Sequence, residues 1–229
     1  MKSDMESRPP MNLDRVMNSQ RVLILSPHTD DAELGAGGTI ARLLDEGKDI
    51  DYVVFSGCET SVPNGMPKDT LRRECQNAAK LIGLQPGRLT IMDYQVRTFP
   101  EHRQEILEDM IRLKELHKPD LVLVPSSNDV HQDHTTIYWE ALRAFKKEAS
   151  IWGYEHPWNN LTFATDIFVR LSEGQVERKI TALKAYESQI TFSQKSYFDE
   201  TNLRSLIYAR GSQVDARYAE AFELVRLLY

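Results

Sequence analysis

The chain has 229 residues, enough to bury one substantial core, and its 41% hydrophobic and 27% charged residues are close to globular averages, which argues against a disordered or fibrous protein. The net charge of -6 and the lack of any basic run argue against a nucleic-acid partner, because phosphate binding needs clustered Lys and Arg. No apolar stretch approaches the roughly 18 residues of a membrane helix, and the first residues lack the apolar core of a signal peptide, so we expect no membrane insertion and a cytoplasmic protein.

Two regions are predicted along the chain. Residues 1–20 contain adjacent prolines and scattered charges without a period, which is typical of a flexible arm. Residues 21–229 are predicted to form a single domain, because their length matches one domain better than two.

The first half of that domain alternates between short apolar runs and amphipathic segments. Strands are predicted at 22–25, 52–55, 89–92 and 121–124, and helices at 39–44, 69–82 and 101–117. This alternation predicts an α/β fold with a Rossmann-like, mostly parallel sheet flanked by helices on both faces.

The C-terminal third is less regular. Strands are predicted at 151–154 and 163–171, and helices at 176–188 and 216–228. The two cysteines, Cys58 and Cys75, do not have the spacing of a zinc site and are interpreted as small buried hydrophobes.

Two short segments are rich in side chains that bind metals. His-Thr-Asp-Asp-Ala-Glu at 28–33 follows the first strand, and Asp-Val-His-Gln-Asp-His at 129–134 follows the strand at 121–124. Because parallel strands place their carboxyl ends at one edge of a sheet, where α/β proteins bind ligands, we expect the two segments to converge. The alternative is that they are ordinary loop residues, with Thr29, Asp30 or Asp31 capping the next helix.

One histidine and one aspartate from the first segment, with one histidine from the second, would leave a fourth position for water on a tetrahedral metal. This is the pattern of a catalytic zinc site. Fe²⁺, Mn²⁺ and Co²⁺ accept the same ligand types, so the ligands alone do not select Zn²⁺.

Residues 27–41, Pro-His-Thr-Asp-Asp-Ala-Glu-Leu-Gly-Ala-Gly-Gly-Thr-Ile-Ala, resemble the signature of the PIG-L/LmbE family of zinc N-deacetylases. The segment His-Gln-Asp-His at 131–134 is similar to the paired-histidine segment of that family. The similarity of layout covers 21–144 and extends more loosely through 185–189 and 218–222.

The resemblance implies a role for each matching residue. His28, Asp31 and His134 would be the metal ligands, and Asp30 would be the general base acting on the attacking water. Spacing alone does not distinguish Asp30 from Asp31. His131 would stabilise the developing oxyanion or protonate the leaving amine.

The same resemblance implies that Asp133 orients the ring of a histidine that binds the metal.

The chain departs from the family pattern at two positions. Thr29 replaces the customary proline, and Leu71 occupies the place of an arginine that the family often has before its helix glutamate. Substrate contacts therefore cannot be transferred to that helix.

Two residues after the strand predicted at 89–92 are candidates for substrate binding. Arg97 would suit a phosphate or carboxylate on the substrate, although a surface arginine is an equal alternative. Asp93 is interpreted as touching the substrate or capping its loop.

The remaining motifs carry weaker hypotheses. The glycines in Gly-Ala-Gly-Gly at 35–38 lack the third glycine of a dinucleotide fingerprint, and we expect them to let the backbone pass close to the metal loop. His102, His117 and His156 belong to no ligand pattern and are interpreted as surface or capping residues.

Together these features predict a metal-dependent hydrolase that removes the N-acetyl group from a small N-acetylated amino sugar or sugar conjugate. A metallophosphoesterase is one alternative, but two-metal sites usually need more bridging carboxylates than these loops offer. A sugar-binding module without turnover is another, but it would be expected to lack Asp30 or a ligand. The sequence is compatible with a homo-oligomer and does not set the oligomeric state.

Overall fold

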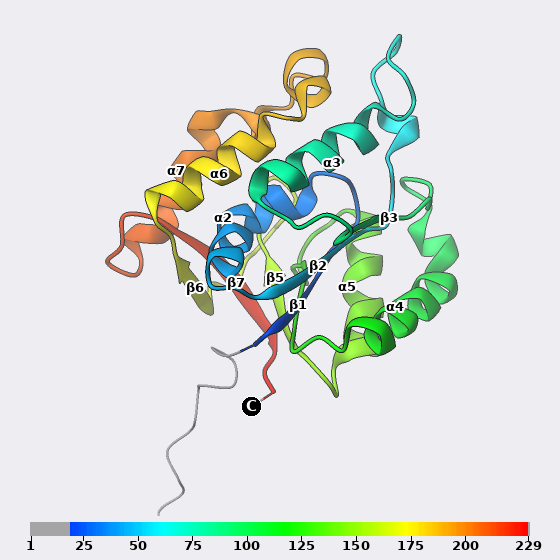
Figure 1. The fold of residues 1–229 in the computed structure, drawn as a ribbon, viewed down its shortest axis with the longest axis horizontal. Coiled ribbons are helices and arrows are strands. Elements are labelled where there is room, and N and C mark those ends of the chain that lie inside the picture. The colour runs from blue at the N-terminus through cyan, green and yellow to red at the C-terminus, as the bar shows by residue number, and fades with distance from the viewer. Residues whose placement is uncertain (1–18, 229) are drawn as a thin grey trace, which may run out of the picture.

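Strands with almost entirely buried residues form the centre of a seven-stranded sheet (Figure 1). The computed structural model describes residues 19–228, so the arm predicted at 1–20 lies, apart from its last two residues, outside the described residues. The strands are β1 (Arg21–Ser26), β2 (Asp49–Val54), β3 (Leu89–Ile91), β4 (Leu121–Pro125), β5 (Ser150–Tyr154), β6 (Ile167–Arg170) and β7 (Ala219–Arg226).

The strand order is β3-β2-β1-β4-β5-β7-β6, and only β7 runs antiparallel to its neighbours. The chain therefore builds outward from β1 on one side through β2 and β3, and then crosses to β4 on the other side. The carboxyl ends of β1 and β4 meet at this change of direction, which is where open α/β sheets form binding crevices. The predicted α/β fold with a mostly parallel sheet is confirmed.

Helices cover both faces of the sheet (Figure 1). They are α2 (Asp31–Asp45), α3 (Thr70–Ile82), α4 (Arg103–His117), α5 (Gln132–Phe145), α6 (Glu173–Leu183) and α7 (Glu200–Ser212). The helices α4 and α5 enclose one apolar core, and α2, α3, α6 and α7 enclose the other. Cys58 and Cys75 are buried without a disulfide, as predicted.

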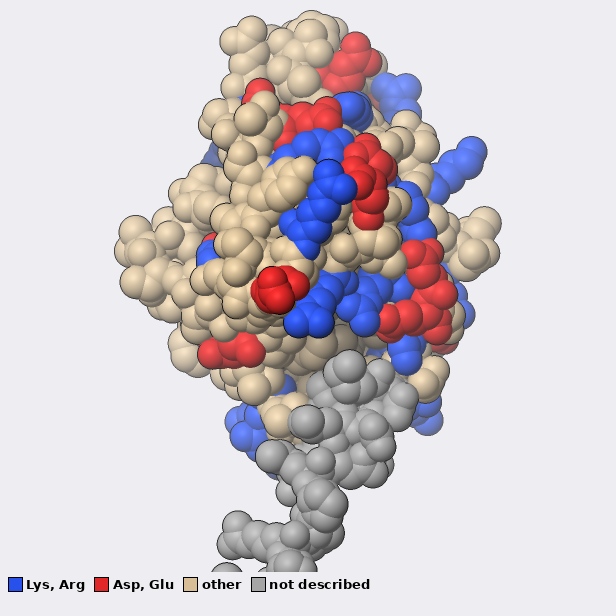
Figure 2. All heavy atoms as spheres, turned by 90° about the vertical axis from the view of Figure 1, so that its left-hand side faces the viewer, with Lys and Arg blue, Asp and Glu red and all other residues tan. Residues whose placement is uncertain are grey.

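Basic and acidic side chains alternate over the face shown in Figure 2. Ion pairs between exposed or half-buried side chains include Arg204 with Glu200 and Arg217 with Glu173. Within residues 19–228, no helix is long and apolar enough to cross a bilayer.

The prediction of a helix at 216–228 is wrong, because β7 occupies Ala219–Arg226. Ala, Glu, Leu and Arg favour helices by intrinsic propensity, but pairing with β5 and β6 and a buried ion pair outweigh that preference. Lys179 Nζ donates to Glu220 Oε1 at 2.6 Å, and the Glu220 carboxylate also accepts the backbone N–H groups of Gly38 and Thr39. Glu220 therefore ties β7 and α6 to α2.

The glycines at 35–38 lie inside α2, which begins eight residues earlier than the predicted helix at 39–44. They therefore allow close packing of this helix rather than a loop. A Cβ on Gly35 would lie 2.6 Å from Tyr154 Cδ2, and one on Gly38 would lie 2.4 Å from Leu171 Cδ1.

We expect Gly35→Ala to lower the free energy of unfolding by about 1–3 kcal/mol, because Tyr154 is fully buried and cannot move aside without disturbing the core. Gly174→Ala is the matched control, since it also lies in a helix but has no heavy atom closer than Ser172 Oγ at 4.0 Å. That control should leave stability unchanged or raise it by up to about 1 kcal/mol. Denaturant unfolding of both variants measures the difference, and equal stabilities would contradict the packing argument.

Candidate metal centre

The loop between β1 and α2 holds the first cluster of ligand-type side chains. Asp30 precedes the helix and Asp31 is its first residue, so the partial positive charge of the helix N-terminus lies beside both carboxylates. The backbone N–H of His28 donates to Asp31 Oδ2 at 2.8 Å. The sequence thus folds this segment into a turn that presents the side chains of His28 and Asp31 together.

Hydrogen bonds hold the loop from two sides. Ser26 Oγ donates to the His28 carbonyl at 2.7 Å and accepts the Ala32 N–H at 3.2 Å. The buried Tyr186 hydroxyl donates to the Thr29 carbonyl. Thr29, which stands where the PIG-L/LmbE signature has proline, is therefore held by a hydrogen bond to its carbonyl.

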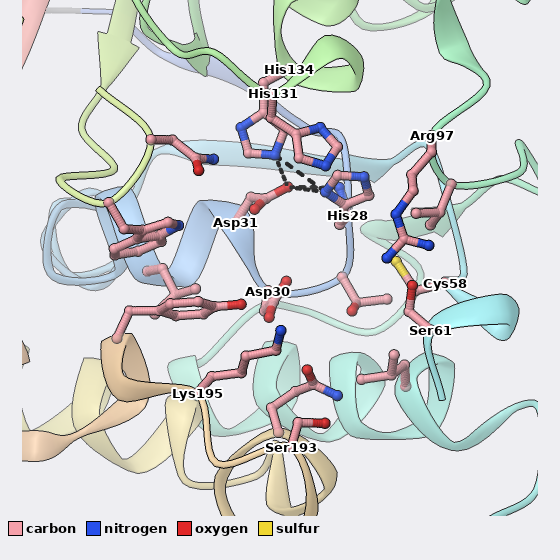
Figure 3. Close-up of a pocket in the computed structure, with 18 of the residues that line it drawn as sticks. His28, Asp30, Asp31, Cys58, Ser61, Arg97, His131, His134, Ser193 and Lys195 are labelled. Carbon is pink, nitrogen blue, oxygen red and sulfur yellow. Dashed lines mark hydrogen bonds and ion pairs between the residues drawn. The ribbon is translucent and has the colours of Figure 1, made fainter. Parts of the chain in front are cut away.

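Three donor atoms from both loops converge in the structure (Figure 3). His28 Nδ1 lies 3.1 Å from Asp31 Oδ2, His134 Nε2 lies 3.2 Å from the same oxygen, and the two nitrogens are 3.2 Å apart. Ligands held about 2.0–2.1 Å from a tetrahedral zinc ion lie roughly 3.3 Å from one another. The predicted convergence of the two segments is present, and the three donors fit such an ion.

Carboxylates behind the two histidines decide which ring nitrogen faces the centre. Asp133 Oδ2 lies 2.9 Å from His28 Nε2, and Asp129 Oδ2 lies 2.7 Å from His134 Nδ1. In the neutral form that would bind a metal, each ring donates a hydrogen bond to the carboxylate it faces, and the lone pair of its other nitrogen is directed at the shared position. The histidine that Asp133 contacts is His28, and its role in orienting that ring stays a prediction.

His131 has a different arrangement. Its Nδ1 accepts the backbone N–H of Asp133 at 3.2 Å and so caps α5. The ring must then carry its proton on Nε2, where it can donate a hydrogen bond. His28, His131 and His134 also form a second set of potential ligands that overlaps the first.

The interpretation of His156 as a surface or capping residue is wrong. It is fully buried, with Nε2 2.9 Å from the Asp31 carbonyl oxygen and Nδ1 3.3 Å from Asp129 Oδ2. His156 joins Asp31 and His134 in another potential ligand set, but both of its ring nitrogens already face oxygens. Its position two residues beyond β5, at the same sheet edge as both motifs, is the signal that could have identified it.

The electric field at the centre favours a cation. Burial opposes charging of His28 and His134, but the neighbouring carboxylates outweigh it and raise the pKa of His28 to about 10 and that of His134 to about 9. Burial would raise the pKa of Asp31, yet the two histidines hold it well below its usual range. The same concentration of negative charge that attracts protons attracts a divalent metal ion.

Asp30 and His131 have the opposite electrostatic character. Burial, and then the charge of Asp31, raise the pKa of Asp30 to about 6. Burial, and then the positive charges of His28 and His134, lower the pKa of His131 to about 4. At neutral pH the site therefore offers a carboxylate that is a much better proton acceptor than an ordinary aspartate, beside a neutral imidazole.

A cavity of about 520 Å³ opens over these groups, and Asp30, Asp31, His28, His131 and His134 all line it (Figure 3). Arg97 also lines it, and its contact with substrate stays a prediction. Asp93 lines an adjacent hollow instead, where its exposed carboxylate pairs with Arg72.

The C-terminal segment 189–197 supplies a wall that the sequence motifs do not indicate. Gln189, Ser193, Lys195 and Tyr197 line the cavity from this side, and the Tyr197 ring stacks on Trp158 at 4.3 Å between centroids. No periodicity or ligand spacing marks these residues, because the segment consists of a π-helical turn (Ser188–Phe192) and a 3-10 turn (Ser196–Phe198) that are too short to show a pattern.

The fold and site define a class: an α/β protein with a mixed histidine and carboxylate cluster, suited to one divalent metal, at the carboxyl edge of its sheet. The sequence profile described as PIG-L, GlcNAc-PI de-N-acetylase, matches residues 23–145, more than half of the chain. The chain belongs to this family, and it is a deacetylase of the PIG-L type.

Individual relatives agree with the family. The uncharacterized deacetylase YaiS of Escherichia coli strain K12 is 29% identical over 170 residues, covering 73% of this chain and 90% of that protein. The diacetylchitobiose deacetylase of Thermococcus kodakarensis is 25% identical over 98% of this chain and 88% of its own length. The N,N'-diacetylchitobiose deacetylase structure from Pyrococcus horikoshii superposes with a TM-score of 0.77 at 22% identity, covering 92% of this chain and 85% of that chain.

Proposed function

We propose that this deacetylase uses zinc to hydrolyse the N-acetyl group of an N-acetylated amino sugar or sugar conjugate. The observation that carries the proposal is the triangle of donor atoms from His28, Asp31 and His134, with edges of 3.1–3.2 Å. Two nitrogens and one oxygen suit zinc, and the three protein ligands leave a position for water or substrate. A bound divalent ion would supply Lewis acidity that acidifies water and polarises the amide carbonyl.

The residues around the triangle would complete the reaction. Asp30 accepts the proton of the attacking water, which its raised pKa favours. His131 donates a hydrogen bond from Nε2 to the carbonyl oxygen as negative charge develops there. Asp133 keeps the His28 ring in the orientation that directs Nδ1 at the centre. Collapse then releases acetate and the free amine, with the proton taken up by Asp30 available to the leaving nitrogen.

Metal removal tests the proposal directly. We expect the purified chain to contain about one zinc ion and to release acetate from at least one member of a panel of N-acetylated sugars and their conjugates. Chelation should abolish acetate release, and added Zn²⁺ should restore it. Mg²⁺ is the control, because it prefers six oxygen ligands and should not restore activity. Undiminished deacetylation by metal-free protein would overturn the proposal.

A further inference from the structure

His156 is a buried histidine at the metal centre that the proposed reaction does not use. It lies two residues beyond β5, and its side chain is 0% exposed. Its Nε2 lies 2.9 Å from the carbonyl oxygen of Asp31, and its Nδ1 lies 3.3 Å from Asp129 Oδ2. Asp31 belongs to the first ligand-rich segment and Asp129 to the second, so this one ring contacts both segments.

Both contacts of this ring lead to residues of the donor triangle. The carbonyl oxygen of Asp31 can only accept, so His156 donates a hydrogen bond from Nε2 to the backbone of that residue. The oxygen of Asp129 that faces His156 also lies 2.7 Å from His134 Nδ1. Asp31 and His134 point toward each other at the cavity (Figure 3), and His156 links the backbone of the first to the carboxylate behind the second.

Aromatic packing and hydrogen bonds fix the place of the His156 ring. The Trp158 ring stacks on it at 5.0 Å between centroids, and the Tyr154 ring meets it edge-on at 5.2 Å. The backbone N–H of His156 donates to Asn160 Oδ1 at 2.7 Å, and Asn160 Nδ2 donates to Ser126 Oγ at 2.6 Å. Ser126 directly follows β4, so the loop that carries His156 is fastened to the strand end that precedes the second ligand segment.

Two separate segments can share one ion only if their spacing is held. His28 and Asp31 come from the loop at the start of α2, whereas His134 belongs to α5. Distances from zinc to its ligands vary by only about 0.2 Å between sites, so a larger displacement of one segment from the other would weaken binding. His156 comes from a third segment and contacts both, which is the arrangement that resists such a displacement.

We propose that His156 is a positioning residue of the metal centre, which holds Asp31 and His134 at the spacing that one zinc ion requires without itself binding the ion. The inference rests on the proposed zinc-dependent function and adds a residue that supports it. Both nitrogens of the His156 ring face oxygens of the protein. His28 and His134 differ in this respect, because each keeps one nitrogen for the shared position.

Zinc affinity, measured by competition with a chromogenic chelator, tests this role without requiring turnover. We expect His156→Ala to bind zinc about 10- to 100-fold more weakly than the wild type, which is the loss typical of residues that support metal ligands. His117→Gln is the matched control, because His117 Nδ1 also faces a carboxylate, that of Asp51 at 2.7 Å, but does not line the cavity. The control should bind zinc as the wild type does.

Conservative variants separate hydrogen bonding from packing. The amide nitrogen of His156→Gln can reach the position of Nε2 and donate to the Asp31 carbonyl, and that of His156→Asn can reach the position of Nδ1 beside Asp129. Each should recover part of the zinc affinity that His156→Ala loses. His156→Leu fills similar space without a polar group, so it should recover none. If His156→Ala does not fold, the comparison of the two amides with leucine decides the question.

The visible spectrum of the Co²⁺-loaded protein reports the geometry of the ligands, since Co²⁺ accepts the same ligand types as Zn²⁺. At saturating Co²⁺ the spectrum of His156→Leu should differ from that of the wild type, and the spectrum of His117→Gln should not. An unchanged spectrum in His156→Leu would contradict the positioning role, because the ligands would then keep their arrangement without this ring.

The affinities also separate this inference from the proposed function. Wild-type affinity in His156→Ala, or equal recovery by leucine and the amides, would overturn the positioning role. Complete loss of zinc from both amide variants would show instead that His156 is a ligand. If the wild type binds zinc but releases acetate from no substrate, the proposed function alone fails, and the affinities still decide the role of His156. A wild type that binds no zinc would contradict both.

Discussion

Replacing Asp30 by asparagine should lower kcat by about 10²–10⁴-fold while leaving the metal content unchanged. Asparagine keeps the size of the side chain and can still precede α2, but it cannot accept a proton from water. Asp30 is outside the triangle of donor atoms, so its loss should not release the ion. Acetate release and metal analysis on the same preparation measure both effects.

The pH profile provides a second measurement of the Asp30 prediction. A base must be ionised to work, so kcat/KM of the wild type should fall as pH drops through the raised pKa of Asp30, which is about 6. The asparagine variant should lack this dependence. Asp45→Asn is the matched control, since Asp45 is the last residue of the same helix and pairs with Arg178 away from the cavity. Normal turnover in Asp30→Asn would show that another group is the base.

The strand and helix pattern was sufficient to predict where the site would form. The apolar runs that became β1 and β4 are continuous because both faces of a central parallel strand are buried, and this feature is visible in the sequence. Since ligand-type residues follow both runs directly, convergence at one sheet edge could be derived from topology alone. The separate roles of Asp30 and Asp31 required the family resemblance, and the geometry now gives a reason: only Asp31 Oδ2 lies within 3.2 Å of both histidines.

Long-range packing explains what the sequence did not reveal. The segment that became β7 has the composition of a helix, and only its two partner strands and the buried contact between Glu220 and Lys179 make it a strand. The cavity wall at 189–197 is built from two short helical turns, which are too short to produce a periodic pattern in the sequence. His156 has no second ligand nearby in sequence, so its position just beyond the strand predicted at 151–154 is the one signal that the sequence offers for it.

Asp93 shows that a position just after a strand does not by itself bring a side chain into the cavity. It follows β3 as Arg97 does, and on that basis the sequence makes both residues candidates for substrate binding. Three residues of loop lie between them. Asp93 turns toward Arg72 on α3, while Arg97, whose backbone is left-handed, lines the cavity. A prediction based on strand ends locates an edge of the sheet, but the backbone conformation of each loop residue decides which side chain reaches the site.

His134→Ala should remove the metal itself. Among residues 19–228, His134 belongs to every set of donor atoms that could hold a metal, so only two ligands would remain in each set. The loss of affinity should exceed the roughly 10- to 100-fold that substitutions behind a metal ligand cause. Metal analysis after dialysis measures this directly, and a protein that retains stoichiometric metal would contradict the assignment of His134.

The matched variant His131→Ala distinguishes the two overlapping sets that contain His28. If His28, Asp31 and His134 hold the ion, His131→Ala keeps its metal and loses turnover, because only the hydrogen bond to the carbonyl oxygen is missing. If His28, His131 and His134 hold it, both alanine variants lose metal alike. The proton positions favour the first result, since His131 Nδ1 caps α5 while carboxylates back the rings of His28 and His134. Thermal unfolding of the two variants without metal completes the comparison, because it shows whether either substitution disturbs the fold and so releases the ion indirectly.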